Sequence, residues 1–167
     1  MGFSLSLMKG GTVVDVRYNG SGWLYDDIVA LLGGKEYERF VSHGQYTGGD
    51  PFDKWLKPFC MLVCEDNYSN AHGTLFVYKT LGVGKLVGTP VAGTMTAVWW
   101  ECLIDPSIVF GISQVGCMDM QNNYLENHAL QPDILIYNTP EEAINGDDVQ
   151  LKAAVEHLLK QLTSKPE

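Results

Sequence analysis

The chain has 167 residues, a length that suits one compact domain or part of a larger one, because single hydrophobic cores usually stop growing only above roughly 250 residues. Hydrophobic residues make up 46% of the sequence and charged residues 19%, which excludes a disordered or fibrous chain. The 11 basic and 20 acidic residues give a net charge of −9. This is the wrong sign for tracking nucleic acid or anionic lipid, so neither is an expected partner.

No part of the sequence resembles a membrane span or a secretion signal. The longest apolar stretches, such as 59–64 and 95–100, are far shorter than the roughly 20 residues that a membrane-spanning helix needs. Residues 1–8 have neither a basic start nor an Ala-x-Ala cleavage site, so we do not interpret them as a signal peptide. The sequence therefore leaves the cellular compartment undetermined.

The cysteines do not form a metal-binding pattern. Cys60, Cys64, Cys102 and Cys117 lie inside apolar runs of a chain too long to depend on disulfides, so we expect reduced core residues. No second pair or histidine cluster follows them at the spacing of zinc ligands. The glycine pair of 19–22 lacks the third glycine of a dinucleotide fingerprint. Neither a metal nor a cofactor is expected.

The first third of the chain predicts a strand, a turn, a short helix and a long loop. Residues 12–17 are rich in β-branched side chains and precede Asn-Gly-Ser-Gly at 19–22, which is typical of a buried strand that ends in a tight turn. Residues 26–32 have the pattern of a short helix closed by glycine. The stretch 35–58 is polar and contains several glycines and prolines. We expect it to form a surface loop of the kind that often contacts ligands.

Strands and helices then alternate along the middle of the chain. Residues 59–64 predict a second buried strand, and 71–81 predict the helix that follows it. Residues 85–87 predict a third strand, and the stretches 95–103 and 108–115 predict longer β segments.

The C-terminal part predicts a last strand over 134–137 and a helix that begins at Asp147 or Asp148. An apolar stripe along this helix is expected to pack on the body of the domain and comprises Leu151, Val155, Leu158, Leu159 and Leu162. Helices that alternate with strands apolar throughout indicate an α/β fold, with a mostly parallel sheet flanked by helices on both faces.

Three features are expected to meet at one edge of this sheet. They are the 19–22 turn, Ser69 in the turn after the second strand, and Glu126 before the last strand. The carboxyl ends of parallel strands lie at the same edge, where ligands bind in such sheets. A serine at the start of a helix lies beside free backbone N–H groups and the positive end of the helix dipole, which together stabilise negative charge on a bound carbonyl oxygen. Ser69 is therefore a candidate nucleophile.

These residues also have ordinary structural interpretations. Ser69 suits the N-cap position of a helix, and the glycines of 19–22 can form a turn and nothing more. His72 follows Ser69 on the same helix, but its side chain would run along that helix and not over the nucleophile. His43 lies in the polar loop, and it and His72 are both possible residues of a cleft.

Four blocks of sequence, in the same order, carry a resemblance to a known family. The blocks are Asp-Val-Arg-Tyr-Asn-Gly-Ser-Gly at 15–22, Glu-Asp-Asn-Tyr-Ser-Asn-Ala-His-Gly at 65–73, Leu-Gly-Val-Gly-Lys-Leu-Val-Gly-Thr-Pro at 81–90 and Leu-Glu-Asn-His-Ala-Leu-Gln-Pro-Asp-Ile at 125–134. They resemble the catalytic core of tricorn-type serine peptidases, which belong with the C-terminal processing, or tail-specific, peptidases. The resemblance implies a ClpP/crotonase-like core fold.

The resemblance also implies residue roles. Ser69 would attack the scissile carbonyl, and the N–H groups of Gly22 and Asn70 would form the oxyanion hole. Glu126 matches the acidic residue that, in the tricorn branch, holds the catalytic apparatus through a bridging hydroxyl. An orienting carboxylate and two preorganised donors are what acyl transfer requires.

The general base of the family has no counterpart in this sequence. In the lysine-using branch it follows the Gly-x-Pro turn, where Thr94 stands here, and no lysine occurs from Leu86 to Leu151. In the tricorn branch it is a histidine upstream of the Asp-Val-Arg strand, and residues 1–11 contain none. We therefore expect 1–11 to be a stub, and 12–167 to be the catalytic core of a longer protein whose upstream segment supplies the base. Alone, the chain should hydrolyse peptides at near-background rates.

The leading interpretation is a serine peptidase domain that cuts peptides or unfolded proteins through an acyl-enzyme on Ser69. One alternative is a catalytically silent peptide-binding or assembly domain with the same fold. The other is a crotonase-like acyl-thioester enzyme, in which Ser69 has no obvious role. The expected partners are a polypeptide substrate and, in a homo-oligomer, further copies of the chain.

Overall fold

The fold is built around a parallel sheet of four strands. The computed structural model describes residues 10–22, 25–51, 55 and 57–164, so the expected stub over 1–11 lies almost wholly outside the described residues. The sheet has the order β1-β4-β5-β8, with β1 at Thr12–Asp15, β4 at Phe59–Val63, β5 at Lys85–Gly88 and β8 at Ile134–Leu135. Each neighbouring pair is parallel, which confirms the predicted fold class.

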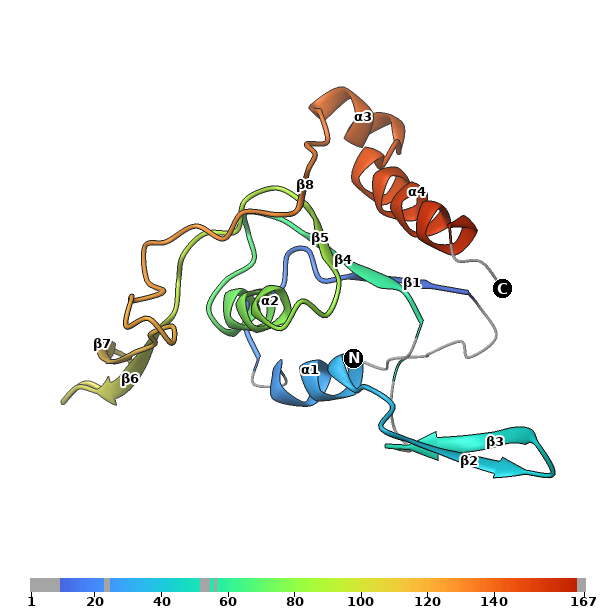
Figure 1. Cartoon of the computed structure of the whole chain (residues 1–167). Helices are drawn as coiled ribbons and strands as arrows, with labels where there is room; N and C mark the ends of the chain where they lie inside the picture. The colour runs from blue at the N-terminus through green and yellow to red at the C-terminus, as the bar shows by residue number, and fades with distance from the viewer. Residues whose placement is uncertain (1–9, 23–24, 52–54, 56, 165–167) are drawn as a thin grey trace.

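Helices cover both faces of this sheet, as Figure 1 shows. The helices α1 (Tyr25–Gly33) and α2 (Asn70–Thr80) lie on one face, and α4 (Val149–Thr163) lies on the other. None of the described helices is long and apolar enough to cross a bilayer.

Strand β4 is the centre of the hydrophobic core, and all five of its residues are buried. Met61 and Val63 pack with side chains of α1 and α2, whereas Cys60 and Leu62 pack with side chains of α4. Successive residues of a strand point to opposite faces, so an uninterrupted apolar run is what a strand between two helical layers requires.

The polar stretch 35–58 is not a loop throughout, and that prediction is wrong. It contains an antiparallel hairpin of β2 (Glu38–Ser42) and β3 (Gln45–Asp50). The two residues at its tip, His43 and Gly44, have φ of 51° and 82°. A two-residue turn with positive φ at both positions matches the right-handed twist of the strands on either side.

A second hairpin pairs β6 (Thr96–Cys102) with β7 (Val109–Gly116), which confirms the predicted β segments. Its strands are not buried, however, contrary to the expectation of apolar strands in the sheet. Trp99, Trp100 and Phe110 are each more than half exposed. In Figure 1 both hairpins project away from the parallel sheet, so their apolar side chains do not join the central core.

The C-terminal segment differs from its predicted pattern in two respects. A short helix, α3 (Pro140–Asn145), follows a capping box formed by Thr139 and Glu142, where only a turn was expected. The side chain of Asp148 caps α4, but most of the predicted stripe is exposed. The residues that α4 buries are Gln150, Ala154 and Leu158. These four-residue steps show that the buried face is narrower than the stripe of leucines suggested.

The four cysteines are free thiols, but they do not all belong to the core. Cys60 and Cys64 are buried, Cys117 is partly buried and Cys102 is exposed. The prediction of four core residues is thus wrong for Cys102, because its strand lies in the projecting hairpin. Among the described residues, no group of three or more acidic, histidine or cysteine side chains is arranged to hold a metal ion.

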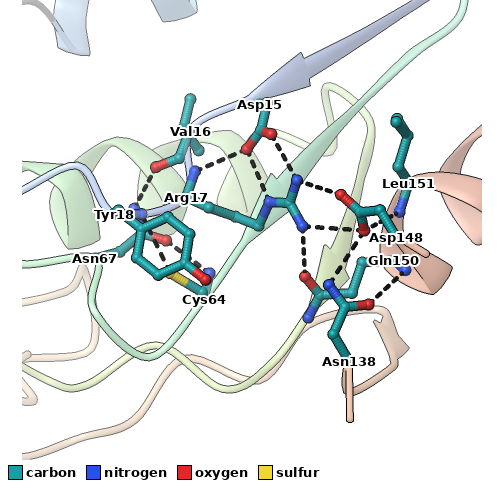
Figure 2. A network of polar contacts seen from close by, with 10 residues as sticks. All are labelled: Asp15, Val16, Arg17, Tyr18, Cys64, Asn67, Asn138, Asp148, Gln150 and Leu151. Carbon is teal, nitrogen blue, oxygen red and sulfur yellow. Dashed lines mark hydrogen bonds and ion pairs between the residues drawn. The ribbon is translucent and has the colours of Figure 1, made fainter. Parts of the chain in front are cut away.

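The end of β1 is fastened to the start of α4 by one guanidinium group, shown in Figure 2. The side chain of Arg17 is 11% exposed and pairs with Asp15 and Asp148, each at 2.7 Å. Its Nη1 also donates to Gln150 Oε1 at 2.9 Å. Two planar carboxylates suit the fork of an arginine, so this network sets where the chain leaves the sheet towards the 19–22 turn.

The Arg17 network should make folding sensitive to acid. Hydrogen bonding to Arg17 lowers the pKa of Asp148 from 3.8 to about 2. A carboxyl whose pKa is depressed by folding stabilises the protein above its unfolded pKa, and this contribution is lost as the pH falls through the folded pKa. The Asp148 side chain is 30% exposed, and after solvent screening we expect a loss of about 1 kcal/mol. The free energy of unfolding would be measured by urea denaturation above the ordinary pKa of 3.8 and near the folded pKa of about 2. In Arg17→Met the acid-dependent loss should shrink by that amount, and an unchanged loss would refute the assignment.

Candidate active site

Ser69 occupies a strained position at the turn between β4 and α2. It stands at the N-cap position, yet its side chain makes no capping hydrogen bond, so capping does not account for the serine. Its backbone has φ 57° and ψ −124°, a region that residues with a Cβ rarely adopt and that costs of order 1–3 kcal/mol. Sharp strand-to-helix turns of this kind present a side chain at the carboxyl edge of a sheet. Observed strain of this type is a pointer to function.

The 19–22 turn lies directly against the Ser69 turn. The Tyr68 N–H donates to the Asn19 carbonyl at 3.1 Å, so the residue before Ser69 is tied to the start of the Gly-rich turn. Within the described part of the chain, the N–H groups of Gly22 and Asn70 have no hydrogen-bond acceptor. Two unpaired backbone donors on adjoining turns are what an oxyanion hole needs.

Glu126 is held by the segment that follows β5. Its Oε2 accepts hydrogen bonds from the Thr96 hydroxyl at 2.8 Å and from the Met95 N–H at 2.7 Å. These bonds, the hydroxyl first, lower the pKa of Glu126, so the side chain is an anion at neutral pH. One residue before Met95, Thr94 Oγ1 accepts the Ser69 N–H at 3.0 Å. Among the described hydrogen bonds, Glu126 is thus linked to the Ser69 backbone through the segment 94–96.

The histidines are not linked to the candidate nucleophile. No hydrogen bond joins a histidine to Ser69 among the residues that the structure describes. His43 is exposed at the tip of the β2–β3 hairpin. His72 is 1% exposed, and its Nδ1 has no hydrogen-bond partner among the residues that the structure describes. Burial lowers the pKa of His72, although the charge of Glu126 opposes this.

A large hollow lined by described residues is not at this edge of the sheet. It has a volume of about 770 Å³ and lies beside Pro58, Phe59 and Val83, where β4 and β5 begin. Ser69 lies beyond the carboxyl end of β4, so this hollow is at the opposite edge and does not bear on the candidate site.

Sequence reasoning placed the two turns together but missed the polar residues that join them. Asn67, Thr94 and Thr96 each bond to a segment distant in sequence. Asn67 lies in the sequence block 65–73 and Thr94 follows the 88–90 turn, so the sequence showed where these residues stand but not which groups they bond. Long-range hydrogen bonds of single polar residues have no sequence periodicity.

Sequence comparison finds archaeal relatives. The chain is 25% identical over 163 residues to the tricorn protease of Thermoplasma acidophilum, in a match that covers 91% of this chain and 14% of that protein. It is 27% identical over 164 residues to a putative tricorn-like protease C-terminal subunit of Sulfurisphaera tokodaii, with coverages of 93% and 18%. The chain therefore spans less than a fifth of the length of these relatives.

Structural comparison finds the same fold. A crystal structure of the tricorn protease superposes with a TM-score of 0.82 at 24% identity, over 93% of this chain and 15% of that one. Mature CPAF superposes with a TM-score of 0.58 at 22% identity, over 67% of this chain and 22% of that one. The sequence profile of peptidase family S41 matches residues 7–136, most of the chain. The predicted resemblance is confirmed, and the chain belongs to peptidase family S41.

Proposed function

We propose that this chain is the catalytic domain of a serine peptidase that cleaves unstructured polypeptides through an acyl-enzyme on Ser69. Membership of peptidase family S41 supports the reaction class. The observation that supports the residue is the strained backbone of Ser69, which lies at a strand-to-helix turn tied to the Gly-rich turn. Backbone strain of order 1–3 kcal/mol persists only where the surrounding structure enforces it.

The proposed chemistry follows from the groups around Ser69. The hydroxyl adds to the scissile carbonyl and loses its proton to a general base, and the N–H groups of Gly22 and Asn70 stabilise the oxyanion that forms. Collapse of this intermediate expels the amine as the base returns the proton, and water then hydrolyses the acyl-enzyme. Glu126 acts as a positioning residue through the segment 94–96.

The general base is proposed to come from outside these 167 residues. Four histidines occur in the sequence, and none of them is hydrogen-bonded to Ser69 in the described structure. A serine hydroxyl without a base is a poor nucleophile, so residues 12–167 are proposed to be a catalytic core that needs a second segment or another subunit. Because this other subunit can be a second copy of the chain, further copies of the chain are also proposed as partners.

Reaction with a fluorophosphonate probe tests the assignment. The chain alone and the longest natural reading frame that contains it would each be treated with the probe and analysed by peptide mass spectrometry. We expect a phosphonylated Ser69 in the longer protein, little modification of the chain alone, and no modification in Ser69→Ala. Thr74→Ala, a hydroxyl one turn further along α2 that bonds Asn70 O, is the matched control and should still be labelled at Ser69.

The other outcomes select between the remaining functions. Labelling of Ser69 in the chain alone would show that the base lies within these residues. A folded longer protein that is never labelled and cleaves no peptide would overturn the peptidase proposal. The second candidate, a non-catalytic peptide-binding domain, would then be favoured. The observation behind it is that no hydrogen bond joins a histidine to Ser69 in the described structure. Acyl-thioester turnover without labelling would identify a crotonase-like enzyme.

A further inference from the structure

We infer that Asn67 is a positioning residue whose carboxamide sets the separation between the Gly22 turn and the Ser69 turn. This inference rests on the proposed function, because it concerns the shape of the proposed oxyanion hole. Asn67 is 0% exposed, although asparagine is mostly found at protein surfaces. A buried polar side chain requires hydrogen-bond partners for both of its ends.

Both ends of the Asn67 carboxamide are bonded to strand ends, as Figure 2 shows. Its Nδ2 donates to the Val16 carbonyl at 2.6 Å, just beyond the end of β1. Its Oδ1 accepts from the Cys64 N–H at 2.8 Å, just beyond the end of β4. The Asn67 N–H also donates to the Cys64 carbonyl at 3.1 Å, which fixes the side chain relative to its own turn.

The carboxamide replaces a missing rung of the β1–β4 ladder. The last regular bond runs from the Val16 N–H to the Leu62 carbonyl at 3.2 Å. In a parallel ladder the next bond would join the Cys64 N–H directly to the Val16 carbonyl. Asn67 instead lies between this donor and this acceptor and bonds to both. The two strand ends are therefore held apart by the width of one amide group.

This separation determines how the two turns meet. Further along both chain segments than the Asn67 carboxamide, the Asn19 carbonyl accepts the Tyr68 N–H at 3.1 Å. Asn19 is three residues before Gly22, and Tyr68 is the residue before Ser69. Without the inserted amide, the strands would either close by a direct bond or leave the partly buried Val16 carbonyl unpaired, which is unfavourable. In both cases Gly22 would shift relative to Ser69 and Asn70.

Asn67→Asp is the sharpest variant for a test in the peptide-cleaving protein. Aspartate keeps the shape and the acceptor for Cys64 but has no N–H to donate to Val16, and its carboxylate faces a carbonyl oxygen. When hydrogen-bond donors are displaced from the oxyanion, the chemical step becomes slower, whereas substrate binding is unaffected. We expect kcat to fall about 10- to 100-fold with KM within about threefold. The affinity of a peptide aldehyde, whose hemiacetal oxygen occupies the oxyanion hole, should fall with kcat.

Asp133→Asn is the matched control. Asp133 also bonds to a strand end, because its Oδ2 accepts the Leu86 N–H at 2.9 Å and its Oδ1 accepts from Lys85 Nζ at 3.1 Å. Leu86 is near the start of β5, at the edge opposite Ser69. This variant should lower the melting temperature but leave kcat and aldehyde affinity unchanged. If Asn67→Asp does not fold, Asn67→Ser removes the long amide while adding no charge, and the same split between kcat and KM is expected.

Amide hydrogen exchange measured by NMR separates failure of this inference from failure of the proposed function. In Asn67→Asp the Tyr68 amide should exchange faster than in the wild type, whereas the Cys64 amide keeps its acceptor. Asp133→Asn should instead affect the Leu86 amide. A folded, inactive wild type of the longer protein would refute the peptidase proposal, and the exchange pattern would still decide whether Asn67 joins the two turns. Unchanged exchange at Tyr68, or an unchanged kcat in an active protein, would overturn the role of Asn67.

Discussion

Replacing Ser69 by glycine is expected to abolish peptide cleavage and at the same time raise the melting temperature. Glycine adopts φ 57° without the Cβ contacts that strain serine, so the folded state should gain part of the 1–3 kcal/mol that such a conformation costs. The larger conformational freedom of glycine in the unfolded chain offsets about 0.5–1 kcal/mol. We expect a net gain of about 1 kcal/mol, or roughly 2–4 °C.

The loss of cleavage should be large because Ser69 is the proposed nucleophile that forms the acyl-enzyme. Removing a serine nucleophile typically lowers the rate at least about 10³-fold. Scanning calorimetry and peptide-cleavage kinetics on the same samples would measure the two effects. Ser69→Ala is the control, since it removes the hydroxyl but keeps a Cβ at the strained position, so its melting temperature should stay near that of the wild type. A Ser69→Gly protein less stable than Ser69→Ala would show that the backbone is not strained.

Replacing Glu126 by alanine is expected to lower kcat/KM about 100-fold, the scale of one lost catalytic donor. The Met95 N–H and the Thr96 hydroxyl would lose their shared acceptor, and Thr94, which accepts the Ser69 N–H, lies next to them. Both donors bond to Oε2, so the amide oxygen of Glu126→Gln can still accept from both, although without the negative charge. The loss should therefore be smaller, about tenfold. Steady-state cleavage of a peptide at neutral pH provides the measurement.

Glu142→Ala is the control for the loss of one negative charge. Glu142 is on α3, far from Ser69. Glu142 accepts the Thr139 N–H at 2.8 Å as part of a capping box, and its loss should cost about 1 kcal/mol of stability without changing kcat/KM. Because hydrogen bonds keep the pKa of Glu126 below its usual range, its protonation should not appear in the neutral pH profile. Equal effects of Glu126→Ala and Glu142→Ala on cleavage would contradict a positioning role for Glu126.

The fold class was predictable because its signals are local. The run Phe59–Val63 is buried throughout, and the sequence shows this as an uninterrupted apolar stretch. The exposure of Trp99 and Trp100 was not predictable, since a β-rich stretch has the same composition whether it joins the central sheet or a projecting hairpin. The β2–β3 hairpin was missed for a related reason, because glycine and polar residues that suit a loop also suit a strand that is open to solvent.

The sequence by itself determined the order of the four strands of the parallel sheet and of α1, α2 and α4, and the serine at a strand-to-helix turn, because these depend on contacts between neighbouring positions. Only the tertiary structure decided the positive φ of Ser69 and the insertion of Asn67 between two strand ends. The Asn67 bond to Val16 joins residues 51 positions apart, and such a bond exists only after the strands have paired. Backbone strain likewise persists only when packing from several directions enforces it, which no local pattern of residues records.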